Sequence, residues 1–371
     1  MKLPEVPAAN TADFQTLFLR ATPLMDMRAP TEFLRGSLPG ATSLPLMTDE
    51  ERAQVGTCYK RQGEGAALAL GHRLVSGKTK TVRLEAWARF AQTHPQGYLF
   101  CFRGGLRSQI VQQWLYQEAN IAYPRVLGGY KAMRGFLTDT LDRAALECQW
   151  TVLGGLTGCG KTEALQQLPH SVDLEGHANH RGSSFGKRPS GQPSPINFEH
   201  SLAVDILRKR TGGIAHFAVE DEGRMIGGCA LPLALFERMG QAPVVWLEDS
   251  FENRVQRILQ DYVLDLCKAH QTVHGAEEGF EVFAQGLRGS LHNITKRLGL
   301  QRYMELDALM QTALTQQRHN GAVELHQAWI ERLLKDYYDP MYTYQQNNKG
   351  KRVVFRGNRA EVVDFLTRAL P

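Results

Sequence analysis

Short apolar runs alternate with amphipathic stretches along the first two thirds of the chain. Six runs have the length and apolar character of buried strands, at residues 24–28, 97–100, 150–153, 171–174, 214–219 and 243–247. Apolar residues at helical spacing follow the second run, at Ile110, Val111, Trp114 and Leu115. Strands that alternate with helices predict an α/β fold, in which parallel sheets are covered by helices on both faces.

After residue 250 the apolar residues recur with the period of a helix. One stripe runs from Phe251 to Leu266, and residues 304–314 and 323–334 repeat the pattern. A short basic strand at 351–356 and a helix at 360–370 are expected to close the chain.

Because 371 residues are too many for one ordinary core, we expect several domains. They are an N-terminal domain (1–140), a linker (141–149), a second parallel-sheet domain (150–265) and a mainly helical C-terminal region (266–371).

The composition is that of a globular protein with a modest positive charge. Hydrophobic residues make up 43% and charged residues 22%, with a net charge of +5. No apolar run approaches the roughly 20 residues of a membrane helix, and the first residues lack the apolar stretch of a signal peptide. We expect a cytoplasmic protein with no membrane partner. The charge is compatible with a nucleic-acid partner and does not establish one.

The cysteines are widely scattered, and none forms a C-x-x-C pair. Neither a zinc site nor a redox dithiol is therefore indicated, and the spacing is not that of a disulfide framework. No tightly bound cofactor is expected. The six are Cys58, Cys101, Cys148, Cys159, Cys229 and Cys267.

Residues 101–108 (CFRGGLRS) place a cysteine between an expected strand and an expected helix. A cysteine reacts as thiolate, and its pKa falls at a helix N-terminus and beside arginines. Ser108 is the expected N-cap of the helix. Gly104 and Gly105 are expected to let backbone N–H groups turn toward the sulfur of Cys101. The flanking cations that would dock an oxyanion are Arg103 and Arg107.

The same loop also fits the C-x-x-G-x-x-R-S pattern of cysteine phosphatases. In those enzymes the loop cradles a phosphate and the cysteine attacks phosphorus. They typically carry His before the cysteine, where this chain has Phe100. From the loop alone, phosphate hydrolysis and chalcogen transfer both stay open.

Three segments around the loop favour chalcogen transfer. Residues 26–33 (DMRAPTEF) and 36–41 (GSLPGA) resemble the N-terminal signature of rhodanese domains, and residues 127–132 (LGGYKA) resemble a downstream one. The resemblance implies an N-terminal rhodanese-like domain in which Cys101 carries a chalcogen as a covalent adduct. It implies that Asp26 and Arg28 hold the fold.

Residues 155–162 (GLTGCGKT) satisfy the phosphate-loop pattern G-x-x-x-x-G-K-[ST] in full. The backbone N–H groups of such a loop face phosphates, Lys161 neutralises them, and Thr162 would bind a magnesium ion. The loop does not recognise a base, so any diphosphate ester fits it. The expected phosphate-binding residues are Gly155, Gly158, Gly160, Lys161 and Thr162. The acid that would hold magnesium through water is left open between two groups, each at the end of an expected strand. They are Glu220, Asp221 and Glu222, and Asp173 and Glu175.

Two clusters mix cations with aromatic residues, as sites for splayed RNA bases do. The first spans residues 177–188 and contains no acid, and the second begins at a group of tyrosines near the C-terminus. The histidines of the first cluster lack the partners of a metal site. The candidate RNA-binding residues are His180, Arg181, Lys187, Arg188, Tyr337, Tyr338, Lys351 and Arg352.

A rhodanese-like domain followed by a phosphate-loop domain resembles the family of bacterial tRNA 2-selenouridine synthases, and so do residues 176–186 and 337–342. The resemblance implies a transferase that replaces the sulfur of wobble 2-thiouridine in tRNA with selenium. It implies that geranyl diphosphate first alkylates the sulfur, and that selenium from selenophosphate then displaces geranylthiol. Cys101 would form an S-selanyl intermediate, and the phosphate loop would bind the diphosphate. The implied partners are tRNA, both small substrates and the synthase that makes selenophosphate.

Other functions stay open from the residues alone. The chain would be a cysteine phosphatase-like or ATP-dependent sulfurtransferase domain fused to a nucleotide-binding or nucleotide kinase domain. In a non-enzymatic class, it would be an RNA-binding scaffold with an inactive rhodanese-like module. Hydrolysis of an aryl phosphate would favour the phosphatase, and tight tRNA binding without turnover would favour the scaffold.

Overall fold

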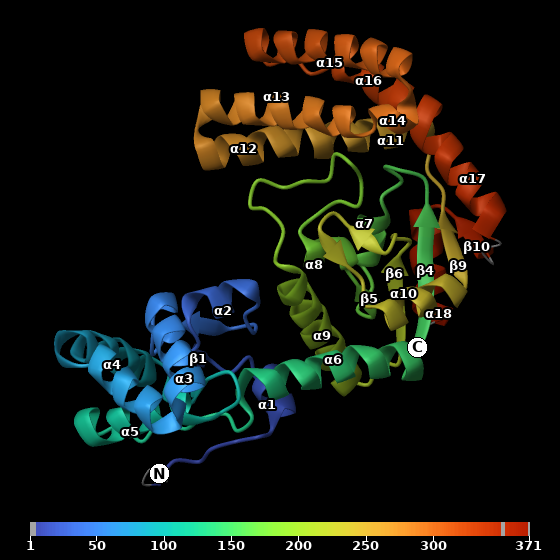
Figure 1. Ribbon diagram of the computed structural model, residues 1–371. Coiled ribbons are helices and arrows are strands. Elements are labelled where there is room, and N and C mark those ends of the chain that lie inside the picture. Colours follow the sequence, from blue (N-terminus) through green and yellow to red (C-terminus); the bar gives the residue numbers. More distant parts are fainter. Residues whose placement is uncertain (1–4, 350–352, 370–371) are drawn as a thin grey trace. The chain divides into compact units, whose positions relative to one another are not determined.

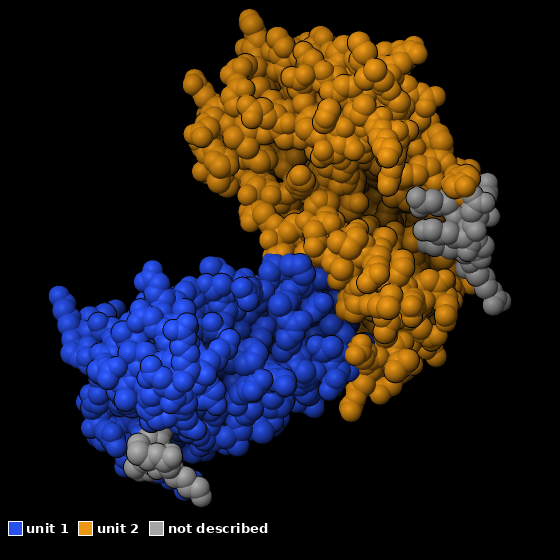
Figure 2. Space-filling view, in the orientation of Figure 1, with its two compact units in different colours: residues 1–141, 194–208 blue, residues 142–193, 209–371 orange. Residues whose placement is uncertain are grey.

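The computed structural model describes residues 5–349 and 353–369, and it divides into two compact units. Unit 1 contains residues 1–141 and 194–208, and unit 2 contains residues 142–193 and 209–371 (Figure 2). The chain therefore returns to unit 1 before it completes unit 2. None of the described helices combines the length and the apolar character that a membrane crossing requires.

Unit 1 is built on a parallel sheet of three short strands. Strand β1 (Leu24–Asp26) lies between β2 (Ala41–Ser43) and β3 (Tyr98–Phe100). Two isolated parallel bridges, Leu99 with Arg125 and Thr11 with Val126, extend the sheet beyond β3. The carboxyl end of β3 leads directly into the cysteine loop, as the apolar run at 97–100 predicted.

Seven of the described helices belong wholly or in part to unit 1. The core joins Met25 and Leu99 of the sheet to Trp87 and Val111 of the helices. The bounds are α1 (Phe14–Leu19), α2 (Pro30–Arg35), α3 (Asp49–Leu74), α4 (Gly77–Thr93), α5 (Leu106–Ala119), α6 (Gly129–Glu147) and α9 (Pro195–Thr211).

Helix α9 is fastened to unit 1 by polar contacts with the chain near Ser37. The Asn197 amide oxygen accepts a hydrogen bond from Ser37 N at 2.7 Å, and His200 Nδ1 lies 2.7 Å from Ser37 O. Burial lowers the pKa of His200 to about 4, so this ring is neutral at physiological pH. The residues expected as a linker, 141–149, continue α6 to Glu147 and then enter the next strand.

Unit 2 contains a five-stranded parallel sheet in the order β10-β9-β4-β6-β5. The central strand β4 is the one that precedes the phosphate loop. The edge strand β10 comes from the far end of the chain, so the C-terminal region completes this sheet. The bounds are β4 (Gln149–Gly155), β5 (Ser171–Val172), β6 (His216–Glu220), β9 (Val244–Leu247) and β10 (Val353–Gly357).

Alternation along β4 directs its side chains to two helical layers. Leu153 packs with α7 (Lys161–Leu165) and α18 (Arg359–Ala369) on one face. Trp150 points to the other face, where its indole N–H donates to Ala144 O of α6 at 3.1 Å. Helix α10 (Leu233–Gln241) also contacts β4, and α8 (Leu174–Ala178) follows β5. A small antiparallel hairpin, β7 (Met225–Ile226) and β8 (Cys229–Ala230), follows β6.

The remainder of unit 2 forms a helical layer above the carboxyl ends of the strands (Figure 1). Its core contains the apolar stripe predicted from Phe251 onward, including buried Val255, Ile258 and Val263. Two π-helical segments, η1 (Gln260–Asp265) and η2 (Leu334–Tyr338), interrupt the α-helices. The other bounds are α11 (Phe251–Leu259), α12 (Leu266–His274), α13 (Ala276–Asn293), α14 (Thr295–Leu298), α15 (Leu300–Asn320), α16 (His326–Leu333) and α17 (Asp339–Lys349).

Candidate active site

The phosphate loop of unit 2 depends on glycines that no other residue could replace without strain. Gly158 and Gly160 have φ angles of +80° and +90°, in the left-handed region. A Cβ at Gly158 would also lie 2.9 Å from the side chain of Ile258 and 3.0 Å from Arg254 O. The motif glycines thus allow the loop to pack closely against α11. The other side of the loop backbone faces a cavity.

The ammonium group of Lys161 lies at the floor of this cavity, 3.3 Å from Gly155 O. Burial acts to lower the pKa of Lys161, but Cys159 and the acidic groups Glu175 and Glu222 raise it above its usual value. Lys161 is therefore positively charged at any physiological pH. A buried fixed cation at a phosphate loop is suited to a diphosphate.

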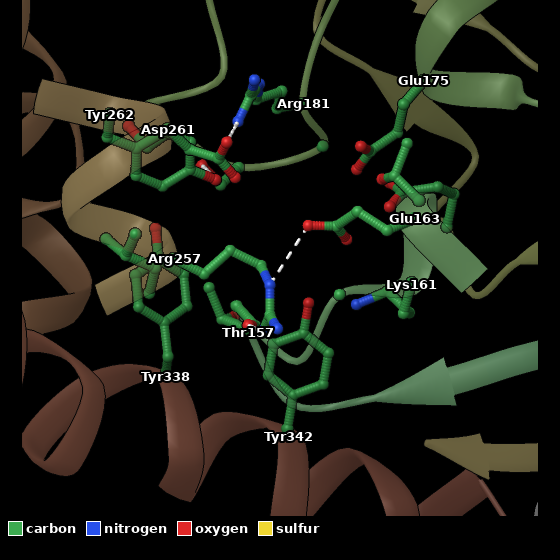
Figure 3. A pocket seen from close by; sticks show the side chains of 18 of the residues that line it. Thr157, Lys161, Glu163, Glu175, Arg181, Arg257, Asp261, Tyr262, Tyr338 and Tyr342 are labelled. Atoms are coloured by element: carbon green, nitrogen blue, oxygen red, sulfur yellow. Dashed lines mark hydrogen bonds and ion pairs between the residues drawn. The ribbon is translucent and has the colours of Figure 1, made fainter. Parts of the chain in front are cut away.

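Two arginines of α11 hold the loop in place, and nothing in the sequence motif identifies them. Arg254 is 3% exposed and donates from Nε to Thr157 O at 2.9 Å. It also pairs with Asp339 at 2.5 Å. Arg257 contacts Gly158 O and pairs with Glu163 at 3.1 Å, as the dashed line in Figure 3 shows.

The cavity above the loop encloses about 480 Å³ and brings together segments that are far apart in the sequence. Arg181 enters from the 177–188 segment and pairs with Asp261 of η1 (Figure 3). Tyr338 and Tyr342 come from η2 and α17 and face the loop from the other side (Figure 3). Residues of both clusters that were proposed to bind RNA therefore line the phosphate-loop cavity.

Glu175 and Glu222 form a carboxyl pair on the wall of the cavity. The two side chains are hydrogen-bonded to each other, so they share a proton. Their oxygens Oε1 lie 2.4 and 2.6 Å from the position that a Cβ on Gly182 would occupy, which leaves room there only for glycine. Burial, and then the charge of Glu175, raise the pKa of Glu222 to about 8.

The acids proposed as magnesium partners occupy different places. Asp173 lines the cavity and caps α8, accepting from Gly176 N at 2.6 Å. Glu220 is fully buried outside the cavity lining, and its carboxylate accepts from Leu174 N at 3.1 Å. Asp221 is likewise not among the lining residues. Of the three consecutive acids after β6, Glu222 is the one that lines the cavity. The sequence left this choice open, because only the backbone decides which of them faces the loop.

The described residues contain no group of three His, Cys, Asp or Glu side chains arranged to hold a metal ion. Thr162 and Asp173 do line the cavity, and oxygen ligands are those that magnesium prefers. A magnesium ion that enters with a diphosphate would take its remaining ligands from phosphate and water.

The candidate RNA-binding residues differ in their exposure. His180 is 5% exposed, and burial lowers its pKa, so it cannot offer a charge to RNA. Tyr338 is 6% exposed. Tyr337 and Arg188 line the cavity, and Lys187 is exposed beside it. The last two candidates, Lys351 and Arg352, lie outside the described residues.

The cysteine loop of unit 1 differs in detail from the expectation. Cys101 is 3% exposed, and its sulfur lies 3.3 Å from Ser108 Oγ and 3.8 Å from Gly105 O. Across the described residues no backbone N–H donates to this sulfur, so the expected ring of N–H groups is not found. Ser108 is not the N-cap, because extended Gly105 starts α5 at Leu106. The Ser108 hydroxyl, in the first turn, is the polar group next to the sulfur.

The two arginines expected to dock an oxyanion have different environments. Arg103 is exposed, with its guanidinium 5.9 Å from the Phe102 ring. Arg107 pairs with Glu32 at 2.7 Å. Burial acts to raise the pKa of Glu32, but the hydrogen bond and charge of Arg107, with Ala29 N–H and Arg52, together lower it. Arg107 is therefore partly neutralised before any substrate binds.

A third arginine, which sequence reasoning missed, lies at the cysteine loop. Arg125 donates from Nη1 to Gly104 O at 2.7 Å, and its Nε is buried without a hydrogen-bond partner in the described structure. Burial lowers the pKa of Arg125, and the Cys101 thiolate acts in the opposite direction. Arg125 is thus a cation held at the cysteine loop.

The fold and the cavity of unit 2 define a phosphate-loop protein of the α/β class, joined to a second α/β unit that carries a cysteine loop. Residues 148–370 match the family described as tRNA 2-selenouridine synthase AAA domain. The tRNA 2-selenouridine synthase of Pseudomonas fluorescens (strain Pf0-1) is 60% identical, over 96% of this chain and 97% of that protein. That of Bordetella bronchiseptica (strain RB50) is 58% identical, over 98% of this chain and 100% of that protein. The chain belongs to the tRNA 2-selenouridine synthase family.

Proposed function

We propose that this protein converts wobble 2-thiouridine in tRNA to 2-selenouridine, through S-geranyl-2-thiouridine. The observation that carries the proposal is the 58–60% identity to tRNA 2-selenouridine synthases over nearly the whole chain. Two features support it, a phosphate-loop cavity with a buried lysine in unit 2 and a cysteine loop in unit 1. In this proposal unit 1 is a rhodanese-like domain, and the enzyme is both a geranyltransferase and a selenotransferase.

The first step belongs to the phosphate-loop cavity. The loop and Lys161 bind the diphosphate of geranyl diphosphate, and Ile294 and Met341 offer an apolar wall to its chain. The thiouridine sulfur attacks the first carbon of the chain, the carbon–oxygen bond breaks, and diphosphate leaves. The fixed charge of Lys161 stabilises that leaving group without reorganisation. Thr162 would supply one hydroxyl ligand to a magnesium ion bound with the diphosphate.

Alkylation at sulfur also requires that the uridine base lose its N3 proton. The Glu175–Glu222 pair is the acceptor that lines the cavity. Because Glu222 has a pKa of about 8, the pair binds a proton readily near neutral pH. The carboxyl pair thus acts as the general base of geranylation.

The second step belongs to Cys101. Alkylation has made the sulfur a better leaving group, so selenium derived from selenophosphate becomes bonded to C2 and geranylthiol departs. Cys101 carries selenium as an S-selanyl adduct in this proposal, next to the Ser108 hydroxyl and the charge of Arg125. Its formation from selenophosphate releases phosphate and consumes a two-electron oxidant, a small disulfide. After the selenium attacks C2, two thiols reduce the selenium–sulfur bond, which frees Cys101 and 2-selenouridine and regenerates the disulfide. Arg103 is the exposed cation that would receive the selenophosphate. Selenophosphate synthase is the enzyme that would supply that substrate.

Two variants test the two steps separately. Each is incubated with 2-thiouridine tRNA, geranyl diphosphate and selenophosphate, and the nucleosides are then analysed by mass spectrometry. Lys161→Ala should form no S-geranyl-2-thiouridine, because the diphosphate loses its charge partner, yet should still selenate RNA that is already geranylated. Cys101→Ala should accumulate S-geranyl-2-thiouridine. Incubation with selenophosphate and a small disulfide as oxidant should add the mass of selenium to the wild-type protein and not to Cys101→Ala.

Matched controls are Lys335→Ala and Cys58→Ala, which remove the same groups from more exposed positions that line neither cavity. Both should retain wild-type product. Selenouridine formed at the wild-type rate by Cys101→Ala, or geranylation at the wild-type rate by Lys161→Ala, would refute the assignment of that step.

A further inference from the structure

A large apolar groove in unit 1 lies between α3 and the first turns of α5, the helix that begins at the cysteine loop. It encloses about 740 Å³, which is within the range of small-molecule sites. Its walls include Val55 and Leu68 of α3, and Ile110 and Trp114 of α5. None of the steps described above uses this groove.

The groove exists because α3 folds back on itself. Gly63 has φ +84° and ψ −177°, which breaks the helix into two arms. A Cβ built on Gly71 would lie 3.8 Å from Val55 Cγ2, although a straight helix would separate residues 16 positions apart by about 24 Å. The arms form a helical hairpin of which only Ala67 is fully buried. Its apolar side faces the groove, and Tyr59 at the rim is 58% exposed.

The cysteine loop closes one end of the groove with polar groups. Arg107 and Arg52 both line it, and both pair with Glu32, at 2.7 and 3.0 Å. Ser108 follows Arg107 in the same turn of α5 and contacts the sulfur of Cys101 at 3.3 Å. One helical turn therefore connects the groove with the reactive sulfur. A ligand that suits this shape has an apolar chain joined to an anionic, polar body.

We propose that this groove binds the geranylthio chain of S-geranyl-2-thiouridine during the selenium step. The inference rests on the proposed function, because that substrate joins a ten-carbon apolar chain to a nucleotide. The chain lies along the walls that α3 and α5 provide, and the nucleotide lies at the arginine end, which presents C2 to the Cys101 loop. The protein then has two prenyl sites, one in unit 2 for the diphosphate ester and one in unit 1 for the thioether.

The test measures the selenium step alone, with anticodon stem-loop RNAs that already carry S-methyl-, S-dimethylallyl- or S-geranyl-2-thiouridine, and selenophosphate. Wild-type kcat/KM should rise with chain length and exceed the S-methyl value by roughly tenfold or more for S-geranyl, because each buried CH₂ favours binding. Val55→Trp fills the groove and should lower the geranyl-to-methyl ratio by about the same factor. The matched control is Val82→Trp, an identical change at a 56% exposed position of α4 outside the groove, which should keep the wild-type ratio.

A second variant tests the same groove independently, in case Val55→Trp does not fold. Tyr59→Ala removes an exposed ring from the rim and should raise KM for the S-geranyl RNA several-fold more than for the S-methyl RNA. Two results would refute the assignment of the geranylthio chain to the groove and leave the proposed function intact. One is equal turnover of all three RNAs by the wild type. The other is a wild-type geranyl-to-methyl ratio of kcat/KM in both Val55→Trp and Tyr59→Ala. Failure of the wild type to convert any S-alkyl RNA would instead overturn the proposed function.

Discussion

Single residues decide the chemistry of the phosphate-loop cavity through their burial. Lys161 keeps its charge because Cys159 and acidic neighbours outweigh desolvation, whereas Glu222 holds a proton near neutral pH because desolvation and Glu175 act together. The cavity therefore contains a fixed cation, which would stabilise the leaving diphosphate in the proposed geranylation, and a carboxyl pair able to accept a proton. Lys161 must stay charged although it is buried, whereas Glu222 must have a raised pKa because it is buried. The charged neighbours of each group decide between these outcomes.

Glu222→Gln tests the proposed general base. The carboxylate is lost as pH falls through about 8, so wild-type geranylation should rise with pH up to that value. The variant should geranylate roughly 10²-fold more slowly and lose this pH dependence. The measurement is the initial rate of S-geranyl-2-thiouridine formation between pH 6 and 9. An identical pH profile in the variant would exclude Glu222 as the base.

Thermal melting of Glu222→Gln tests the raised pKa of Glu222 without an activity measurement. Because the pKa of Glu222 is raised in the folded state, the folded chain binds more protons than the unfolded chain between an ordinary carboxyl pKa near 4.3 and about 8. That group therefore makes the wild type less stable as pH rises through this window. Glu222→Gln removes the effect, so its Tm relative to the wild type should increase from pH 5 to pH 8.

At the scale of elements, the 177–188 segment is a structural bridge within unit 2. Phe185 is 2% exposed and stacks between Tyr262 and Trp329, at 6.2 and 5.9 Å between ring centroids. Ser184 Oγ donates to Ser290 O at 2.8 Å. These contacts tie the segment to the helical layer, which places Arg181 over the phosphate loop. An aromatic residue between cations thus serves as an anchor and not as a platform for RNA bases.

Phe185→Ala should therefore destabilise unit 2. Removal of a buried phenyl ring costs about 3–5 kcal/mol, which corresponds to a fall in Tm of roughly 10 °C for a unit of this size. Lys187→Ala, an exposed change in the same segment, should shift Tm by less than about 2 °C. Calorimetry or circular dichroism measures both. Equal melting of the two variants would contradict the anchoring role.

At the scale of the whole molecule, each unit contains its own chemical centre within its own residues. All lining residues of the phosphate-loop cavity belong to unit 2, and those of the α3–α5 groove, like the cysteine loop, belong to unit 1. The intermediate between the two proposed steps is a stable, modified RNA. Nothing in the chemistry requires that both centres belong to the same polypeptide.

A mixture of Cys101→Ala and Lys161→Ala should therefore form 2-selenouridine, although neither variant forms it alone from 2-thiouridine tRNA. S-geranyl tRNA made by the first variant would be selenated by the second. The yield should rise with the concentration of the second variant, as transfer through solution requires. Absence of product from the mixture, while Lys161→Ala converts added S-geranyl RNA, would show that the intermediate is not released.

The sequence by itself determined the elements that local chemistry specifies. The strand before each loop, the α/β class and the phosphate loop follow from apolar periodicity and from glycines whose positions the backbone requires, and residues 244–247 and 150–153 lie in strands as predicted. Cys101 was likewise placed at the end of a strand. Such features depend on neighbours in the chain, so they can be read from it.

Only the tertiary structure decided which distant side chains share a site. Arg254 and Arg257 reach the phosphate loop, Glu222 and not Glu220 faces it, and Arg125 lies at the cysteine loop, without a motif to mark any of them. The α3–α5 groove likewise depends on a single reversal at Gly63. Burial and long-range approach set these contacts, and both are properties of the packed chain that local sequence patterns do not encode.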